Sequence, residues 1–352
     1  MRLLITGGAG FIGANAAIVL AARHPDWEVV GLDSLYRKGS ELNVPRLEAA
    51  GVGFVRADVR SADALLGVGP IDALLECSAE PSALAGIGES PDFVVHTNLL
   101  GAYNCLELAR RFGAYLVFLS TSRVYPVHAL RSLSLVETET RYELAAEQSF
   151  DGASADGIAE RFALDGARTL YGTTKLAAEL LIEEYREAYG LRAVVDRCGV
   201  VAGPWQMGKV DQGVFTHWLL AHHFRRPLRY IGFGGHGKQV RDVLHVEDLI
   251  ELLDEQLTDP ARWDGAKVNV GGGRARSLSL LETSALCAEL TGTSLNVGRV
   301  SQTRPGDVPL YISDCAQLAK LTDWRPRRDA REIMADTHEW IVEQEASLQR
   351  LL

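Results

Sequence analysis

The sequence predicts an α/β protein with a doubly wound parallel sheet and a smaller C-terminal domain. The strand candidates are short, continuously apolar runs at 2–6, 28–32, 53–56, 71–75, 115–119 and 192–196. Amphipathic helical patterns separate several of them, at 12–23, 98–112 and 173–189. Continuously apolar strands that alternate with helices are typical of a parallel sheet covered on both faces. A glycine-rich turn follows the first strand, so a Rossmann-type arrangement is favoured.

Composition and charge narrow the class of protein. The chain has 352 residues, 47% hydrophobic and 23% charged, as expected for a globular protein of one large or two modest domains. A formal net charge of −10 makes a nucleic acid a poor partner. No apolar stretch approaches the roughly 20 residues of a membrane span, and no secretory signal opens the chain. Five scattered cysteines without a CxxC motif favour free thiols and a cytoplasmic location.

We expect two domains with different tasks. Residues 1–196 form the dinucleotide-binding domain, and 197–352 form most of a substrate-binding domain that is partly interleaved with the first. Beyond residue 196 the pattern is irregular, with helical stretches near 213–225, 246–257, 278–291 and 329–345, and one strand could return to the main sheet. The polar insertion at 126–170 is longer than ordinary connections. It either covers the active site as a lid or forms a mobile surface segment.

The turn after the first strand has the spacing of a dinucleotide site. Gly7 permits a tight turn, Gly10 lets backbone N–H groups approach a pyrophosphate, and Gly13 lets the helix pack close to the strand. Phe11 and Ile12 open that helix, whose N-terminus attracts phosphate. These five residues are our candidate pyrophosphate-binding residues.

Acidic residues after the second and third strands indicate which cofactor is bound. Asp33 ends the second strand, where a carboxylate accepts hydrogen bonds from ribose hydroxyls and repels a 2′-phosphate, so NAD is favoured over NADP. Arg37 and Lys38 keep NADP open as an alternative. Asp58 and Val59 follow the third strand and are candidates for contact with the adenine, with a solvated turn residue as the alternative for Asp58.

Tyr171 and Lys175 are candidates for the chemistry. They lie one helical turn apart and therefore project from the same face. A phenol is a poor base at neutral pH, but an adjacent ammonium and a nicotinamide cation would stabilise the phenolate. Thr121, within Ser120-Thr121-Ser122 at the end of the preceding strand, is the third candidate catalytic residue.

These motifs resemble the extended short-chain dehydrogenase/reductase superfamily, and in particular its nucleotide-sugar epimerases. The resemblance covers nearly the whole chain and includes TGGAGFIG at 6–13, STSRVY at 120–125, YGTTK at 171–175, GKQVRDVLHVED at 237–248 and RPGD at 304–307. SLYRKG at 34–39, ETETRY at 137–142 and DQG at 211–213 are similar to the CDP-paratose (CDP-tyvelose) 2-epimerases. That branch inverts C2 of a CDP-3,6-dideoxyhexose.

The resemblance implies a role for each matching residue. Tyr171 would remove a proton from a sugar hydroxyl, Lys175 would hold the nicotinamide ribose, and Thr121 would hydrogen-bond the reacting hydroxyl. Tyr171 and Lys175 therefore also belong to the cofactor-binding residues. Asn98 would help to order the active-site face, or it could simply cap a helix.

The resemblance also implies how the substrate binds and how the enzyme assembles. Arg241 and Arg304 would bind the diphosphate of a nucleotide sugar, with Ser122 as a further substrate contact.

No residues have the spacing of a metal site, and we interpret His222 and His223 as a solvated helix face. The helices at 98–112 and 173–189 carry apolar faces that in similar enzymes form a homodimer.

Residues after Thr121 favour epimerisation over other reactions of the superfamily. Similar dehydratases carry Asp-Glu there, and similar decarboxylases carry Glu where Arg123 stands, whereas this chain has Ser122-Arg123. The expected activity is transient oxidation of a nucleoside-diphosphate sugar to a keto-sugar, followed by hydride return to the opposite face. The alternatives are a reductase, dehydratase or decarboxylase of a related sugar nucleotide, or a non-catalytic NAD-binding regulatory protein on the same fold.

Several positions depart from the family pattern and leave the substrate open. Glu76 stands where relatives usually have His, and it could either be paired structurally or contact substrate. Val200 and Ala202 replace an Asn and a Tyr in a segment that lines the sugar pocket of relatives. The base, the sugar and the inverted carbon are therefore not determined by the motifs.

Overall fold

The computed structural model describes residues 1–208 and 212–351 and divides into two compact units. Unit 1 contains Met1–Thr121, Leu170–Arg197 and Ile250–Lys267. Unit 2 contains Ser122–Thr169, Cys198–Leu249 and Val268–Leu352. By contacts, most of the 126–170 insertion therefore groups with the C-terminal segments. The functional division at 196/197 stays a prediction, and Asp211 of the DQG stretch lies outside the described residues.

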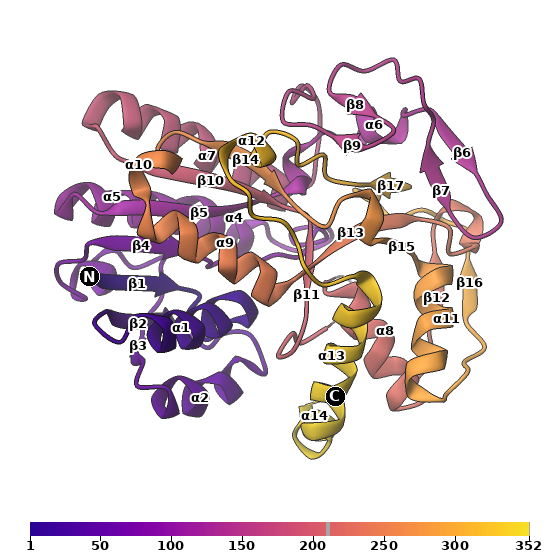
Figure 1. Ribbon diagram of the computed structural model, residues 1–352, viewed down its shortest axis with the longest axis horizontal. Coiled ribbons are helices and arrows are strands. Elements are labelled where there is room, and N and C mark those ends of the chain that lie inside the picture. Colours follow the sequence, from indigo (N-terminus) through magenta and orange to yellow (C-terminus); the bar gives the residue numbers. More distant parts are fainter. Residues whose placement is uncertain (209–211, 352) are drawn as a thin grey trace. The chain divides into compact units, whose positions relative to one another are not determined.

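Unit 1 is organised around a seven-stranded sheet with the order β14-β10-β5-β4-β1-β2-β3 (Figure 1). The strands of this sheet are β1 (Arg2–Thr6), β2 (Glu28–Asp33), β3 (Gly53–Arg56), β4 (Ala73–Glu76), β5 (Tyr115–Thr121), β10 (Ala193–Cys198) and β14 (Lys267–Val270), of which Cys198 and most of β14 group with unit 2. The strands from β3 to β5 pair in parallel. The strand order reverses at β1 and β4, which is where doubly wound sheets bind ligands. This confirms the predicted Rossmann-type fold, including a late strand that returns to the sheet.

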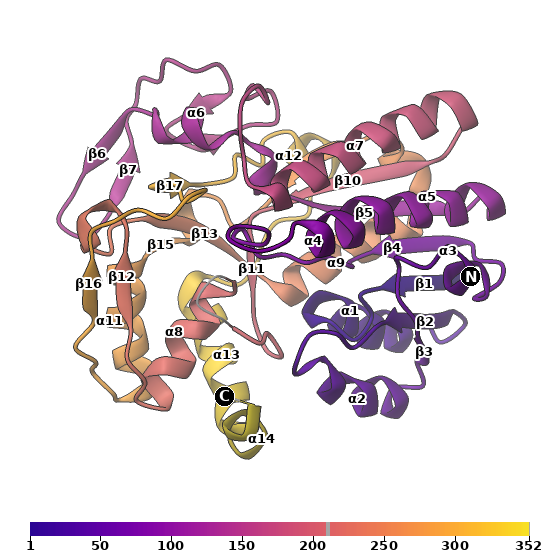
Figure 2. The ribbon, with the colours of Figure 1, turned by 180° about the vertical axis from the view of Figure 1, so that it is seen from behind.

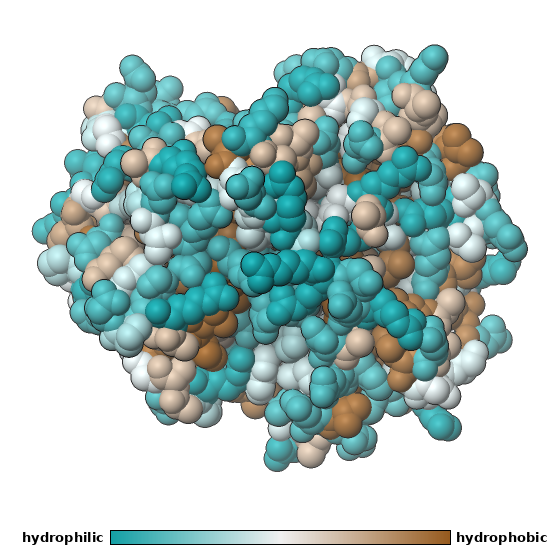
Figure 3. Space-filling view, viewed as in Figure 1, coloured by the Kyte–Doolittle hydropathy of each residue, from teal (hydrophilic) through white to brown (hydrophobic). Residues whose placement is uncertain are grey.

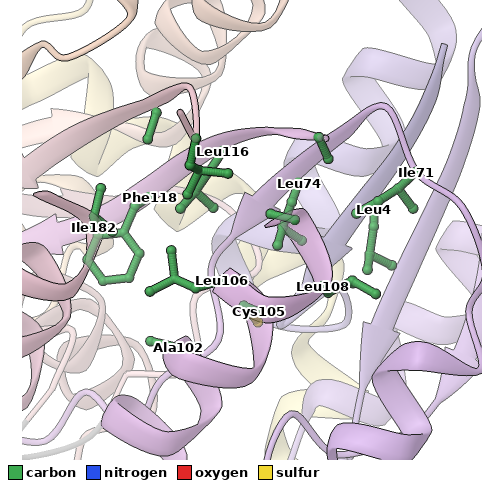
Figure 4. Packing of buried hydrophobic residues seen from close by; sticks show 14 of the residues in the cluster. Leu4, Ile71, Leu74, Ala102, Cys105, Leu106, Leu108, Leu116, Phe118 and Ile182 are labelled. Carbon is green, nitrogen blue, oxygen red and sulfur yellow. The ribbon is translucent and has the colours of Figure 1, made fainter. Parts of the chain in front are cut away.

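Helices cover both faces of this sheet. They are α1 (Phe11–Arg23), η1 (Ser40–Asn43), α2 (Val44–Ala49), α3 (Ala62–Leu66), α4 (Asp92–Val95), η2 (His96–Leu100), α5 (Gly101–Phe112), α7 (Leu170–Tyr189), α9 (Val246–Thr258) and α10 (Pro260–Trp263). Helices α1 and α9 lie on one face, and α5 and α7 lie side by side on the other (Figures 1 and 2). Apolar side chains from β1, β4, β5, α5 and α7 form the core beneath the second face (Figure 4).

The helix expected at 98–112 begins earlier than predicted. Helical structure starts at Asp92 and runs through α4, the π-helical η2 and α5 to Phe112. The start signals are Ser90, whose hydroxyl accepts the Asp92 N–H, and Pro91, followed by an acid that favours the positive end of the helix. Asn98 therefore lies inside the helical run and is not its cap.

Unit 2 is built from small sheets and a helical layer. Its strands are β6 (Leu135–Glu137), β7 (Tyr142–Leu144), β8 (Ala153–Ser154), β9 (Gly157–Ile158), β11 (Val200–Ala202), β12 (Arg229–Ile231), β13 (Val240–His245), β15 (Ser277–Ser279), β16 (Gly298–Val300) and β17 (Leu310–Tyr311). Strand β13 is central, because it pairs with β11, β15 and β17. The helices are η3 (Ser122–Val124), α6 (Val127–Arg131), α8 (Val214–His223), η4 (Phe233–Gly235), η5 (Arg274–Arg276), α11 (Leu280–Thr291), α12 (Leu318–Leu321), α13 (Ala330–Glu343) and α14 (Glu345–Leu351). Helices α8, α11 and α13 pack together around an apolar core.

The insertion at 126–170 has structure of its own. It contains α6 and two antiparallel pairs, β6–β7 and β8–β9. Phe162 is buried and meets the Tyr125 ring edge-on at 5.9 Å. Within unit 2, the Tyr142 N–H also donates to the Lys238 carbonyl. The segment is thus anchored within unit 2, while its role as a lid stays a prediction.

The surface in Figure 3 is mainly hydrophilic on the face that the figure shows. Among the described residues, no helix combines the length and the apolar character needed to cross a bilayer.

Candidate functional site

The glycine turn between β1 and α1 has the shape of a phosphate cradle. Gly7 has a φ of 65°, and a Cβ there would lie 2.8 Å from the Cys77 carbonyl oxygen. A Cβ on Gly13 would overlap the Gly7 carbonyl oxygen. The first backbone N–H groups of a helix have no intrahelical partner, and here they belong to Phe11, Ile12 and Gly13 after the N-cap Gly10. The turn therefore fits the pyrophosphate of a dinucleotide.

Asp33 is oriented by the backbone around it. One carboxylate oxygen accepts the Ala9 N–H at 3.2 Å and the other accepts the Leu35 N–H at 2.8 Å. Burial raises the pKa of Asp33, although these backbone N–H groups act in the opposite direction. A carboxylate has about four acceptor positions, so the group can still accept a hydrogen bond from a ribose hydroxyl.

Asp58 and Val59 already have partners within the protein. The Arg60 guanidinium binds the Asp58 carboxylate at 2.6 Å, and its hydrogen bonds lower the pKa of Asp58. The Val59 carbonyl accepts a hydrogen bond from Asn104, and its side chain is buried. An adenine contact would therefore have to share Asp58 with Arg60.

Asn98 links the start of α7 to the segment after β4. Its side-chain oxygen accepts the Glu80 N–H at 2.7 Å, and its side-chain nitrogen donates to the Glu80 carbonyl and to Thr174 Oγ1. Thr174 in turn donates to the Tyr171 carbonyl at 2.8 Å. The capping interpretation is thus wrong, and Asn98 helps to hold the helix that carries Tyr171 and Lys175. Thr174 was missed, although a threonine three residues after Tyr171 is placed for such a back-bond.

Lys175 forms a buried ion pair with Glu76. The ammonium lies 3.1 Å from Glu76 Oε2, and both side chains are at most 3% exposed. Burial alone would lower the pKa of Lys175, but the charges of Glu76 and Tyr171 raise it overall. The ammonium also lies 4.4 Å from the centre of the Phe118 ring. Of the two possibilities for Glu76, the structure thus supports structural pairing.

A second buried ion pair lies further along α7. Arg197 of β10 binds the Glu179 carboxylate at 2.7 Å, and Ser120 donates to the same carboxylate at 2.5 Å. Thr121, the buried last residue of β5, directly follows Ser120. Glu179 was missed, yet its spacing places it on the same helix face as Tyr171 and Lys175, which is a usable signal.

In unit 2, arginines surround the RPGD loop at 304–307. Arg241 donates to the Asp307 carboxylate at 2.9 Å and to the Val240 and Val308 carbonyls. Burial lowers the pKa of Arg241 to about 10, despite the opposing charge of Asp307. Arg123 donates to the Gly306 carbonyl, and Arg131 to the Arg304 and Asp307 carbonyls. Two of the predicted substrate residues, Arg241 and Arg304, thus belong to one arginine-rich loop cluster.

The remaining sequence-based candidates in unit 2 have mainly structural surroundings. Ser122 begins η3, and its carbonyl accepts the Tyr125 N–H. Ala202 is buried in the apolar core of unit 2, and Val200 packs against that core. His222 is also buried and contacts the Thr293 carbonyl, so its interpretation as a solvated residue was wrong. Among the described residues, no cluster of three metal-ligating side chains was found.

Comparisons with known proteins identify the family. The CDP-paratose 2-epimerase of Salmonella typhi is 29% identical over 97% of this chain and 99% of its own. A dTDP-glucose 4,6-dehydratase of Streptomyces antibioticus is 30% identical over 97% of this chain and 92% of its own. The crystal structure of Thermus thermophilus UDP-glucose 4-epimerase in complex with NAD matches with a TM-score of 0.77 and 27% identity, covering 97% and 99% of the two chains. Because the model of the NAD dependent epimerase/dehydratase family matches residues 3–271, the chain belongs to that family, and its cofactor is NAD.

Proposed function

We propose that the protein is an epimerase that acts on a nucleoside-diphosphate sugar. The observation that carries this proposal is the residue pattern around the candidate catalytic groups. Tyr171 and Lys175 share one face of α7, and Thr121 ends β5. Ser122 and Arg123 follow Thr121, so the chain has no carboxylate there to assist the elimination of water. This set of groups suits reversible oxidation of a carbinol better than dehydration.

Each residue has a defined task in the proposed reaction. NAD, when bound in the glycine turn, supplies reversible redox chemistry at the carbinol carbon. Tyr171 takes the proton of the reacting hydroxyl and later returns it. Lys175 binds the nicotinamide ribose from the same helix face as Tyr171, while Thr121 orients the hydroxyl. Inversion then requires the keto-sugar to present its other face before it is reduced.

We further propose a CDP-3,6-dideoxyhexose as substrate, inverted at C2. The match to the Salmonella typhi CDP-paratose 2-epimerase over 97% of the chain supports this choice. The arginine cluster of unit 2 supports the diphosphate, because guanidinium groups suit its forked recognition, although Arg123 and Arg241 would have to share donors with Gly306 and Asp307. We also propose a cytoplasmic location, which the five scattered cysteines, with no CxxC motif among them, support.

Dehydration of a sugar nucleotide is the second candidate. It is favoured by the match to the Streptomyces antibioticus dehydratase, whose identity of 30% is no lower than that of the epimerase. The two reactions differ in mass balance. Epimerisation leaves the mass of the sugar unchanged, whereas dehydration removes one water molecule, so mass spectrometry of the product separates them.

The test is proton NMR of the NAD-loaded protein with CDP-paratose in deuterium oxide. We expect a new epimer without net formation of NADH, with its couplings changed at C2 and the hydrogen at that carbon retained. Incorporated deuterium would contradict the proposed redox route, because it would indicate enolisation. A product lighter by one water molecule would support the dehydratase instead.

The variant Tyr171→Phe tests the assignment of the base. It should lower turnover by at least about a thousandfold, because the proton acceptor is lost, and it should still bind NAD. Isothermal titration with NAD and the same NMR assay measure the two properties. Turnover within tenfold of the wild type would contradict the role of Tyr171.

A further inference from the structure

The pairing of Glu76 with Lys175 depends on the centre of the sheet. Glu76 is the last residue of β4, and its backbone is in register with Thr6 of β1 on one side and Phe118 of β5 on the other. It therefore lies where the strand order reverses, next to the glycine turn. Its carboxylate accepts from Lys175 Nζ on one oxygen and from Ser78 Oγ on the other.

This geometry changes the electrostatic effect of Lys175 on the phenol of Tyr171. An ammonium promotes loss of the phenol proton through its positive charge. Here a carboxylate lies 3.1 Å from that ammonium, and both groups are almost inaccessible to water. Screening by solvent and salt is weak at such a site, so the two charges largely cancel at the position of a third group. The buried pair then contributes almost no net charge beside Tyr171.

Other titratable groups near the pair do not restore a positive charge. Tyr171 lies on the same helix, Cys77 follows β4, and Cys105 comes from α5. Burial raises the pKa of both thiols, which therefore stay protonated and neutral. The Phe118 ring that faces the ammonium from β5 carries no charge. Among the described residues, Glu76 is thus the group that decides the net charge around Lys175.

We propose that Glu76 is a positioning residue that holds the Lys175 ammonium and neutralises it, so that Tyr171 keeps its proton until the positively charged cofactor is bound. The idea rests on the proposed role of Tyr171 as the base. The proposal explains why position 76 is Glu in this chain, where relatives usually have His. Only an acidic side chain can cancel the charge of Lys175. Proton removal would then be coupled to the presence of oxidised NAD.

The test is an ultraviolet titration of Tyr171 in the protein without cofactor. Tyrosinate absorbance near 295 nm is recorded against pH, and the same curve for Tyr171→Phe is subtracted to isolate this residue from the other nine tyrosines, ten being present in all. In Glu76→Gln, we expect the midpoint of the Tyr171 titration to fall by about one pH unit relative to the wild type. Added NAD should lower the midpoint in both proteins, because the positive charge of the cofactor adds to the field at Tyr171.

Two further variants distinguish the effect of the lost negative charge from an effect of the substitution on folding. Glu76→Asp keeps the negative charge, so its midpoint should stay nearer to the wild type than to Glu76→Gln. Glu76→His introduces the residue usual in relatives and should shift the midpoint in the same direction as Gln, which preserves the test if Gln disrupts folding. Glu289→Gln serves as a control for removal of a paired carboxylate, because Glu289 of α11 is paired with Arg331 instead.

Unchanged midpoints in both the Gln and the His variants would overturn the proposal, as would an Asp variant that shifts as far as Gln. The titration needs no sugar nucleotide. Failure of every nucleotide sugar to react would therefore count against the proposed function alone and would leave this test intact.

Discussion

At the scale of single residues, Asp196 is a carboxyl group that is fully buried in β10. One of its oxygens accepts a hydrogen bond from the neutral Gln256 amide at 2.9 Å, while the other has no hydrogen-bond partner. Burial raises the pKa of Asp196 from 3.8 to about 7. The folded protein thus binds a proton here that the unfolded chain releases at much lower pH.

This difference predicts how pH affects stability. Because the folded pKa is raised, the contribution of Asp196 to the free energy of unfolding is greatest below about pH 4 and is lost as the pH rises to about 7. Asp196→Asn does not titrate, and its amide can donate to the Gln256 oxygen, which also lacks a partner. The stability of the variant relative to the wild type should therefore rise between pH 5 and pH 8 by on the order of 2 kcal/mol. Urea unfolding at the two pH values measures this, and an equal difference at both would contradict it.

At the scale of elements, the Glu179–Arg197 pair joins α7 to β10 and, through Ser120, to the end of β5. Both charged side chains are at most 2% exposed. Removing one partner of such a pair leaves the other charge buried without compensation, whereas replacing both by apolar residues can be nearly neutral. The pair therefore contributes little to the net free energy of unfolding, and its main effect is to fix how α7 packs against β10 and β5.

The prediction is a double-mutant cycle. Arg197→Met should lower the free energy of unfolding by about 3 kcal/mol, because the buried Glu179 carboxylate would keep only the Ser120 hydroxyl and the more distant Lys267 ammonium, at 3.7 Å, as partners. The variant with both Arg197→Met and Glu179→Leu should recover most of that loss. Urea unfolding measures the stabilities, and strictly additive effects of the two substitutions would show that the groups do not interact.

The same elements show how far sequence reasoning reaches. Strands β1 and β3 have the predicted bounds, and for β1 the reason is that a buried parallel strand is a continuous apolar run. Strands β6 to β9 have only two or three residues each, and contacts distant in sequence, such as Tyr142 with Lys238, support them. The spacing of Tyr171 and Lys175 predicted that they share a helix face. Glu76 lies 99 residues from Lys175 in the sequence, so their contact depends on the tertiary structure and could not be predicted from spacing.

At the scale of the whole molecule, unit 1 presents an apolar helical surface that we propose as a homodimer contact. Helices α5 and α7 lie side by side (Figure 2). Tyr103 on α5 is 43% exposed, and Leu180 and Tyr189 on α7 are 55% and 59% exposed. Large apolar side chains that are exposed together on neighbouring helices indicate an interaction surface. A two-fold contact would place the same two helices of a second copy against them.

Leu180→Arg tests this surface, because it would place a charge among apolar side chains at the proposed contact. We expect light scattering at micromolar concentration to give twice the chain mass for the wild type and the chain mass for the variant. Val342→Arg is the matched control, since Val342 is also about half exposed, at 51%, but lies on α13. It should leave the mass at the dimer value. A monomeric wild type would contradict the dimer itself, while a dimeric Leu180→Arg would place the contact away from α5 and α7.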